Sequence, residues 1–309
     1  TAYEIPKRDW SSDVCSSDLV GSWSSGGAMN TARGRLAGVG TSTAGLGFGG
    51  YTPTVSTAAS EAYNGTSWTN TPSLGTNRAT LASAGTQTAA LAISGNTPPR
   101  TAVTEAYNGT SWTSTGSVNT ARYGLGGAGT QTAALAFGGL STVSYTGATE
   151  SFNGTSWTTL PGTMGTARYT FGSAGTQTAA LGFGGYNPTL GLTGTNATES
   201  WNGTAWTAGG NLGTSRYRNG GAGTQTSALA FGGNNPSFTS VTELYNGTSW
   251  TSNPTGLGTA RSFMGSAGTQ AAALSMGGKT SQPNAGTTTA TESWTGPSTT
   301  LNYKTLTTS

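Results

Sequence analysis

The chain has 309 residues and a formal net charge of +3, and it contains 51 glycines, 11 prolines and nine tryptophans. The small net charge and the many tryptophans argue against an intrinsically disordered chain, and no apolar run is long enough for a transmembrane helix. So much glycine disfavours helices and favours many short strands joined by tight turns.

The N-terminal segment differs in composition from the rest of the chain, because it holds every aspartate and the only cysteine. Residues 9–19, DWSSDVCSSDL, resemble a translated sequencing-library adapter, and residues 1–5 resemble the outer part of the same adapter. We therefore expect residues 1–19 to be a non-native segment outside the fold. Residues 20–309 are expected to form one domain, taken from environmental DNA and extending farther upstream in its natural form.

Six repeats of about 45 residues follow, and such a period is the signature of a repeat architecture. One arginine marks each repeat: Arg33, Arg78, Arg122, Arg168, Arg216 and Arg261. One glutamate follows in each repeat: Glu61, Glu105, Glu150, Glu199, Glu243 and Glu292. A Gly-Thr-Gln-Thr type of segment and a Gly-Gly or Ser-Gly pair recur between the two.

Within one repeat, the local signals indicate four strands. In the third repeat, residues 122–128 and 133–139 face each other across the Gly-Thr-Gln-Thr turn. The segments TESF (149–152) and TSWT (155–158) are joined by Asn-Gly, a pair whose positions both favour positive φ and which predicts a hairpin. Four strands in each of six repeats predict an all-β fold, a six-bladed β-propeller with four antiparallel strands per blade.

The order of arginine, strand, Gly-Gly pair, variable loop, aromatic residue and tryptophan resembles the kelch repeat, over almost all of residues 20–309. The chain departs from that family where Asn, as at Asn64, replaces the acidic residue after the aromatic one. The low charge and the segment GTQTAALAFGG (129–139) resemble the kelch-like proteins of marine bacteriophages in particular. That resemblance implies a virion-associated or tail-associated protein.

The ends of the repeat array predict how the ring closes. In the sixth repeat Trp294 is followed by TGPSTT instead of NGTSWT, so the outer strand is missing from the local pattern. At the other end, Trp23 stands ten residues before Arg33, a spacing close to that between tryptophan and arginine elsewhere. We expect residues 20–25 to pair antiparallel with residues 291–294 as the outer strand of the sixth blade. In the alternative arrangement, residues 301–306 fill that edge.

The residue inventory argues against an enzyme. After residue 19 the chain has no His, Asp or Cys, which excludes Ser-His-Asp triads, Cys-His pairs and zinc sites with nitrogen or sulfur ligands. We expect no catalytic residue, metal or cofactor. The six glutamates could ring a channel and hold a cation. A Glu–Arg pair in each blade is the simpler expectation, because the arginine fork satisfies carboxylates and carbonyls together.

The stretch from the glycine pair to the glutamate varies in length and in amino-acid sequence among the repeats. These loops leave the same end of every blade, so they should cluster on one face, where recognition usually resides. Aromatic and cationic residues in them suit stacking on sugars: Tyr51, Arg100, Tyr145, Tyr186, Phe238 and Lys279. Neutral variation of the loops is the alternative interpretation.

These features predict a non-enzymatic binding or structural propeller. The leading hypothesis is a phage virion-associated or tail-associated adhesion module that recognises a host surface glycan or another virion protein. The alternative is a bacterial secreted or cell-surface protein-interaction propeller. A virion or extracellular location is expected in either case. Membrane insertion is not expected, and the few positive charges form no stripe of the kind that binds nucleic acid.

Overall fold

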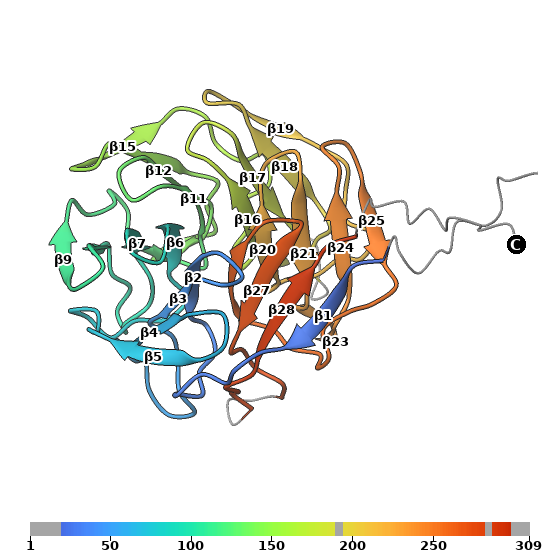
Figure 1. Cartoon of the computed structure of the whole chain (residues 1–309). Helices are drawn as coiled ribbons and strands as arrows, with labels where there is room; N and C mark the ends of the chain where they lie inside the picture. Colours follow the sequence, from blue (N-terminus) through green and yellow to red (C-terminus); the bar gives the residue numbers. More distant parts are fainter. Residues whose placement is uncertain (1–19, 189–193, 282–285, 298–309) are drawn as a thin grey trace, which may run out of the picture.

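The computed structural model of the chain describes residues 20–188, 194–281 and 286–297. These residues form a six-bladed β-propeller with four antiparallel strands in each blade (Figure 1). The three described ranges contain no helix that is long and apolar enough to cross a membrane. Residues 1–19, which we expect to be non-native, lie outside the described residues, so their place relative to the propeller stays a prediction.

The blades run from an inner strand at the axis to an outer strand at the rim. The first blade contains β2 (Ala37–Gly40), β3 (Gly45–Phe48), β4 (Ser60–Tyr63) and β5 (Trp68–Thr71). The second contains β6 (Ala82–Gly85), β7 (Ala90–Ile93), β8 (Thr104–Tyr107) and β9 (Trp112–Thr115). The third contains β11 (Gly126–Gly129), β12 (Ala134–Phe137), β14 (Thr149–Phe152) and β15 (Trp157–Leu160).

The other three blades follow the same plan. The fourth contains β16 (Gly172–Gly175), β17 (Ala180–Phe183), β18 (Thr198–Trp201) and β19 (Trp206–Ala208). The fifth contains β20 (Gly220–Gly223), β21 (Ala228–Phe231), β24 (Thr242–Tyr245) and β25 (Trp250–Asn253). The sixth contains β26 (Gly265–Gly268), β27 (Ala272–Met276), β28 (Thr291–Thr295) and β1 (Ser22–Ser25). Two short pairs, β10 (Arg122–Tyr123) with β13 (Leu140–Ser141) and β22 (Asn234–Asn235) with β23 (Ser237–Phe238), lie outside the blades.

Strand β1 closes the ring, as the sequence predicts. It pairs antiparallel with β28, with Trp23 opposite Trp294, and Figure 1 shows the two strands side by side. The Trp23 ring lies 5.4 Å from that of Trp294 and 4.8 Å from that of Phe231 in the fifth blade. Residues 301–306, the competing candidate for this edge, lie outside the described residues.

The Asn-Gly hairpin before the outer strand of the first five blades differs in detail from the sequence prediction. Strand β15 begins at Trp157, two residues later than expected. The Asn153 Oδ1 accepts hydrogen bonds from the N–H groups of Thr155 and Ser156 at 3.0 and 2.9 Å. Of the Asn-Gly pair, only Gly154 has a positive φ, 96°. The asparagine side chain thus holds a longer turn, and strand pairing starts at the tryptophan.

Neighbouring blades are joined by side-chain hydrogen bonds as well as by their buried second strands. Gln131, in the turn of the third blade, donates to the carbonyls of Ala90 and Tyr107 in the second blade, at 3.1 and 2.5 Å. Four other glutamines donate equivalent hydrogen bonds to carbonyls of the preceding blade: Gln87, Gln177, Gln225 and Gln270. Ser42 stands at this place in the first blade.

The inner strands approach one another closely around the axis. A Cβ at Gly127 would lie 2.4 Å from the carbonyl oxygen of Ser83 on the neighbouring strand, so only every other strand can carry a side chain there. The sequence follows this constraint, because glycine and serine alternate at the equivalent position: Gly38, Ser83, Gly127, Ser173, Gly221 and Ser266. The axis is therefore lined by backbone and small side chains.

A buried arginine and a buried glutamate form an ion pair inside each blade. In the third blade Arg122 Nη2 lies 2.7 Å from Glu150 Oε1, and Arg122 Nη1 donates to the carbonyls of Gly138 and Ala148. The second carboxylate oxygen of Glu150 accepts from the N–H of Asn119 at 2.7 Å. The six pairs are Arg33–Glu61, Arg78–Glu105, Arg122–Glu150, Arg168–Glu199, Arg216–Glu243 and Arg261–Glu292.

Burial and pairing act in opposite directions on these arginines. Burial lowers the pKa of Arg33 and of Arg78 to about 10, and the nearby glutamate partly opposes this effect. Both guanidinium groups therefore remain charged at neutral pH. Each glutamate is held by the arginine of its own blade, and the described residues hold no group of His, Cys, Asp or Glu side chains placed to bind a metal ion. The pairs connect the strands of one blade, and we find no cation-binding arrangement of the glutamates in the described part of the chain.

Candidate functional site

One end of the axis is bounded by six residues, each two positions after a buried arginine, that share a left-handed backbone. Their φ angles lie between 51° and 65°. Each N–H donates to the carbonyl of its counterpart in the preceding blade at 2.6–2.9 Å, so the hydrogen bonds form a closed circle. We call this circle the axial ring: Arg35, Thr80, Gly124, Thr170, Arg218 and Phe263.

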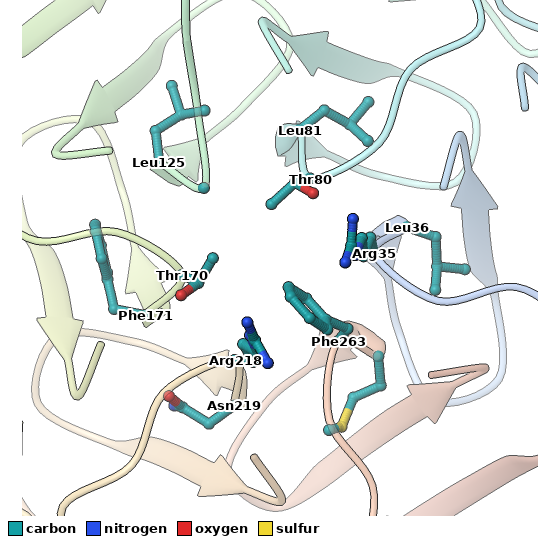
Figure 2. A pocket seen from close by; sticks show the side chains of 12 residues that line it. Arg35, Leu36, Thr80, Leu81, Leu125, Thr170, Phe171, Arg218, Asn219 and Phe263 are labelled. Carbon is teal, nitrogen blue, oxygen red and sulfur yellow. The ribbon is translucent and has the colours of Figure 1, made fainter. Parts of the chain in front are cut away.

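The axial ring is a strained part of the backbone. The left-handed conformation costs about 1–2 kcal/mol for a residue other than glycine, and five of the six ring members carry a side chain. Strain of this kind persists where surrounding structure enforces it, and it clusters at functional sites. Figure 2 shows its consequence, since Arg35, Thr80, Thr170, Arg218 and Phe263 all point toward the axis.

Two cavities adjoin the axial ring. One, of about 130 Å³, is lined by ring members together with Tyr123 and Tyr169, and we call it the axial mouth. The other, of about 100 Å³ (Figure 2), is lined by the ring and by the residues that follow it, among them Leu81 and Phe171. Both have room for a small polar group or several waters, since a water occupies about 30 Å³ in the liquid.

Five tyrosines, the tyrosine cluster, gather beside the axial mouth: Tyr123, Tyr145, Tyr169, Tyr186 and Tyr217. Tyr169 is central, with ring centroids 5.7, 5.3 and 5.6 Å from those of Tyr123, Tyr145 and Tyr186. Burial, and then the neighbouring tyrosines, raise the pKa of Tyr169 to about 12. Its hydroxyl is therefore neutral and can donate a hydrogen bond to a ligand.

The four cations of the described residues that lie outside the core pairs also belong to this end. Arg35 and Arg218 place their guanidinium carbons 4.9 and 4.5 Å from the ring centroid of Phe263. The guanidinium carbon of Arg100 lies 4.9 Å from the ring centroid of Tyr123. Lys279 is 1% exposed, and burial together with the charges of Arg35 and Arg218 lowers its pKa to about 8. The described residues hold six glutamates, all in core pairs, so this end carries a net positive charge.

The structure brings most of the sequence-predicted loop residues to this site. Tyr145 and Tyr186 are part of the tyrosine cluster. The ring centroid of Tyr51 lies 5.4 Å from the guanidinium carbon of Arg35, and Arg100 stacks on Tyr123. Lys279, expected as a loop residue for sugar contacts, is instead buried, because it bridges Ser262 and Thr287 on either side.

Phe238 lies at the outer edge of the same face. It pairs with Asn234 in the β22–β23 hairpin, and Asn234 in turn bridges Tyr217. The described contacts therefore place it two strand positions outward from the tyrosine cluster. Whether it contacts a ligand stays a prediction.

Nine residues of the axial ring and the tyrosine cluster were not predicted from the sequence: Arg35, Thr80, Tyr123, Gly124, Tyr169, Thr170, Tyr217, Arg218 and Phe263. A signal for them exists. The two positions that follow the buried arginine read GR, AT, YG, YT, YR and SF in the six repeats, inside a stretch of otherwise regular spacing. Variation at fixed repeat positions would have pointed to the axial ring and to the tyrosines beside it.

No protein-family model matches the chain, and no similar curated protein was found. The chemistry of the site therefore has to come from its own side chains. Flat amphipathic tyrosines can stack on the apolar faces of sugar rings while their hydroxyls form hydrogen bonds, and the nearby guanidinium groups can donate to oxygen acceptors.

Proposed function

We propose that this propeller is a non-enzymatic binding module that recognises a surface glycan through the axial mouth and the tyrosine cluster. The observation that carries the proposal is the tyrosine cluster itself, contributed by repeat positions that vary beside a strained ring. Tyrosines offer a large contact area with few rotatable bonds, so ordering them on binding loses little entropy. The rigid propeller then supplies the preorganisation that strengthens binding.

The biological setting we propose is a virion-associated or tail-associated adhesion protein, acting on the virion or outside the cell. The resemblance to the kelch-like proteins of marine bacteriophages supports this setting. The partner is a host surface glycan, and another virion or surface protein is the competing partner. A bacterial secreted or cell-surface interaction propeller is the alternative setting. We propose no cofactor, no nucleic-acid ligand and no insertion into a membrane.

The test is binding of the full chain to a panel of surface polysaccharides, followed by titration of the best ligand. Tyr169→Ala removes the centre of the cluster, and truncating such a half-buried aromatic side chain should weaken binding by about 1–2 kcal/mol, or roughly five- to thirtyfold. Val143→Ala is the matched control, because Val143 is 89% exposed in the loop that carries Tyr145. Unfolding temperatures establish that both variants are folded.

Two results would contradict the proposal. The first is equal binding by the wild type and by Tyr169→Ala in folded protein, which would move the site elsewhere. The second is the appearance of new reducing ends when the chain is incubated with its ligand, which would show an enzyme. Binding of a protein from the host surface in place of any glycan would favour the competing partner.

A further inference from the structure

The charges at the axial mouth do not balance within the protein. Arg35 and Arg218 flank Phe263 in the axial ring, and Figure 2 shows both side chains directed at the axis. Every glutamate of the described residues is engaged with a core arginine. Cations that converge without a carboxylate repel one another, and an anion placed among them relieves that repulsion.

The backbone cannot serve as the anion receptor here. In the axial ring each N–H is already used by the hydrogen-bond circle, with donor–acceptor distances of 2.6–2.9 Å. Recognition of an anion at this end must therefore come from side chains. The guanidinium groups suit this role, because stacking on the Phe263 ring leaves their N–H edges open.

We infer that Arg35 and Arg218 form an anion subsite at the axial mouth, and that the chain binds an acidic saccharide bearing a carboxylate or sulfate group. This inference rests on the proposed glycan-binding function and names the class of glycan. The axial mouth of about 130 Å³ accommodates one such group between the arginines and Tyr169. The adjoining sugar rings then lie on the tyrosine cluster.

An acidic saccharide fits the site better than an acidic peptide. The aromatic surface next to the arginines is made mainly of tyrosines, with four centroid separations of 5.3–5.7 Å that join Tyr169 to three neighbours and Tyr186 to Tyr217. These rings are inclined to one another by 53–89°, so the cluster presents both apolar faces and hydroxyl edges, which match the apolar and polar faces of sugar rings. The peptide remains a defined outcome of the test.

The experiment compares two matched ligands by calorimetric titration of the full chain at low salt. One is an oligogalacturonate, and the other is the same oligosaccharide with its carboxyl groups reduced to alcohols. We expect the wild type to bind the acidic ligand at least tenfold more tightly, and we expect added salt to remove most of the difference, since screening weakens exposed charge contacts. This comparison needs no variant.

Substitutions then locate the subsite. Arg35→Asn and Arg218→Asn are combined, because asparagine tolerates the left-handed backbone better than other side chains. The double variant is expected to lose most of the preference, because its affinity for the acidic ligand should fall close to the affinity for the neutral one. Val143→Ala is the control, since Val143 is 89% exposed in the loop that carries Tyr145, and it should retain the preference.

The outcomes separate the two proposals. Equal wild-type affinity for the acidic and the neutral ligand overturns the anion subsite and leaves glycan binding intact. Binding of poly-glutamate without binding of either saccharide supports the anion subsite and rejects the glycan function. A preference for the acidic ligand that is undiminished in the folded double variant overturns the assignment to Arg35 and Arg218.

Discussion

One threonine–tryptophan contact recurs between blades and is broken at a single place. In five blades the indole N–H of the outer-strand tryptophan donates to a threonine hydroxyl of the preceding blade at 2.9–3.2 Å: Trp23–Thr242, Trp68–Thr291, Trp157–Thr104, Trp206–Thr149 and Trp250–Thr198. In the second blade the acceptor position is Ser60, and both Trp112 Nε1 and Ser60 Oγ are buried without a partner in the described residues. Ser60→Thr should restore the missing bond.

The size of the effect follows from the two unpaired atoms. A buried polar group without a partner costs about 1–3 kcal/mol, and the methyl group of threonine restricts the hydroxyl to fewer rotamers. We expect Ser60→Thr to raise the free energy of unfolding by about 1–2 kcal/mol, close to the net value of one buried hydrogen bond. For a domain of this length, such a gain raises Tm by about 2–5 °C.

Urea unfolding followed by tryptophan fluorescence measures this change, with calorimetry as a second readout. Thr104→Ser is the reciprocal control, because it imposes the Ser60 arrangement on Trp157, and it should lower stability by a similar amount. In a Trp112→Phe background the gain from Ser60→Thr should vanish, since the donor is gone. A gain that persists in that background, or a loss of stability in Ser60→Thr, would refute the reasoning.

Three further predictions concern ring closure, the core pairs and pH. Trp23→Ala should lower the free energy of unfolding by about 3 kcal/mol, because it removes ring contacts at 4.8 and 5.4 Å. If Trp23→Ala and Trp23→Phe have the same free energy of unfolding in urea, closure of the ring by β1 is contradicted. Glu150→Gln should destabilise by about 3–5 kcal/mol, since it leaves the Arg122 charge buried and unpaired; a change below 1 kcal/mol in urea unfolding would be inconsistent with the pair. Affinity for an acidic saccharide should fall from pH 7 to pH 9, because Lys279, facing Arg35 and Arg218, loses its charge near its pKa of about 8. Lys279→Met should flatten that slope in calorimetric titrations, and an unchanged slope would exclude Lys279 as its source.

Much of the propeller could be predicted because the same local sequence signals recur in all six repeats. A single Asn-Gly turn or a single Ala-Leu-Ala-Phe strand is a weak signal. Repetition at constant spacing from Arg122 and its counterparts turns it into a strong one. Even the closure of the ring by β1 could be predicted from Trp23, which precedes Arg33 by the spacing that separates tryptophan from arginine in the other repeats. No complete repeat precedes Trp23, so its strand was expected to pair with the sixth repeat, as it does.

The candidate site was harder to predict because its backbone contradicts local propensity. A position that requires positive φ normally reads as glycine, and only Gly124 in the axial ring does so. The Thr170, Arg218 and Phe263 backbones adopt φ angles of 51–60° because the hydrogen-bond circle enforces them, and a circle that joins six blades is visible only after folding. The loop tyrosines were predictable because they lie in the stretches that vary between repeats.

A crystal structure of the full chain with a bound trigalacturonate tests the central claim most directly. We expect one carboxylate within hydrogen-bonding distance of both Arg35 and Arg218, and sugar rings stacked on Tyr169 and Tyr186. The oligosaccharide should be recovered uncleaved. A ligand bound at the opposite end of the axis, among the Gly-Thr-Gln-Thr turns that carry Gln131, would contradict the site, and a cleaved ligand would contradict a purely binding function.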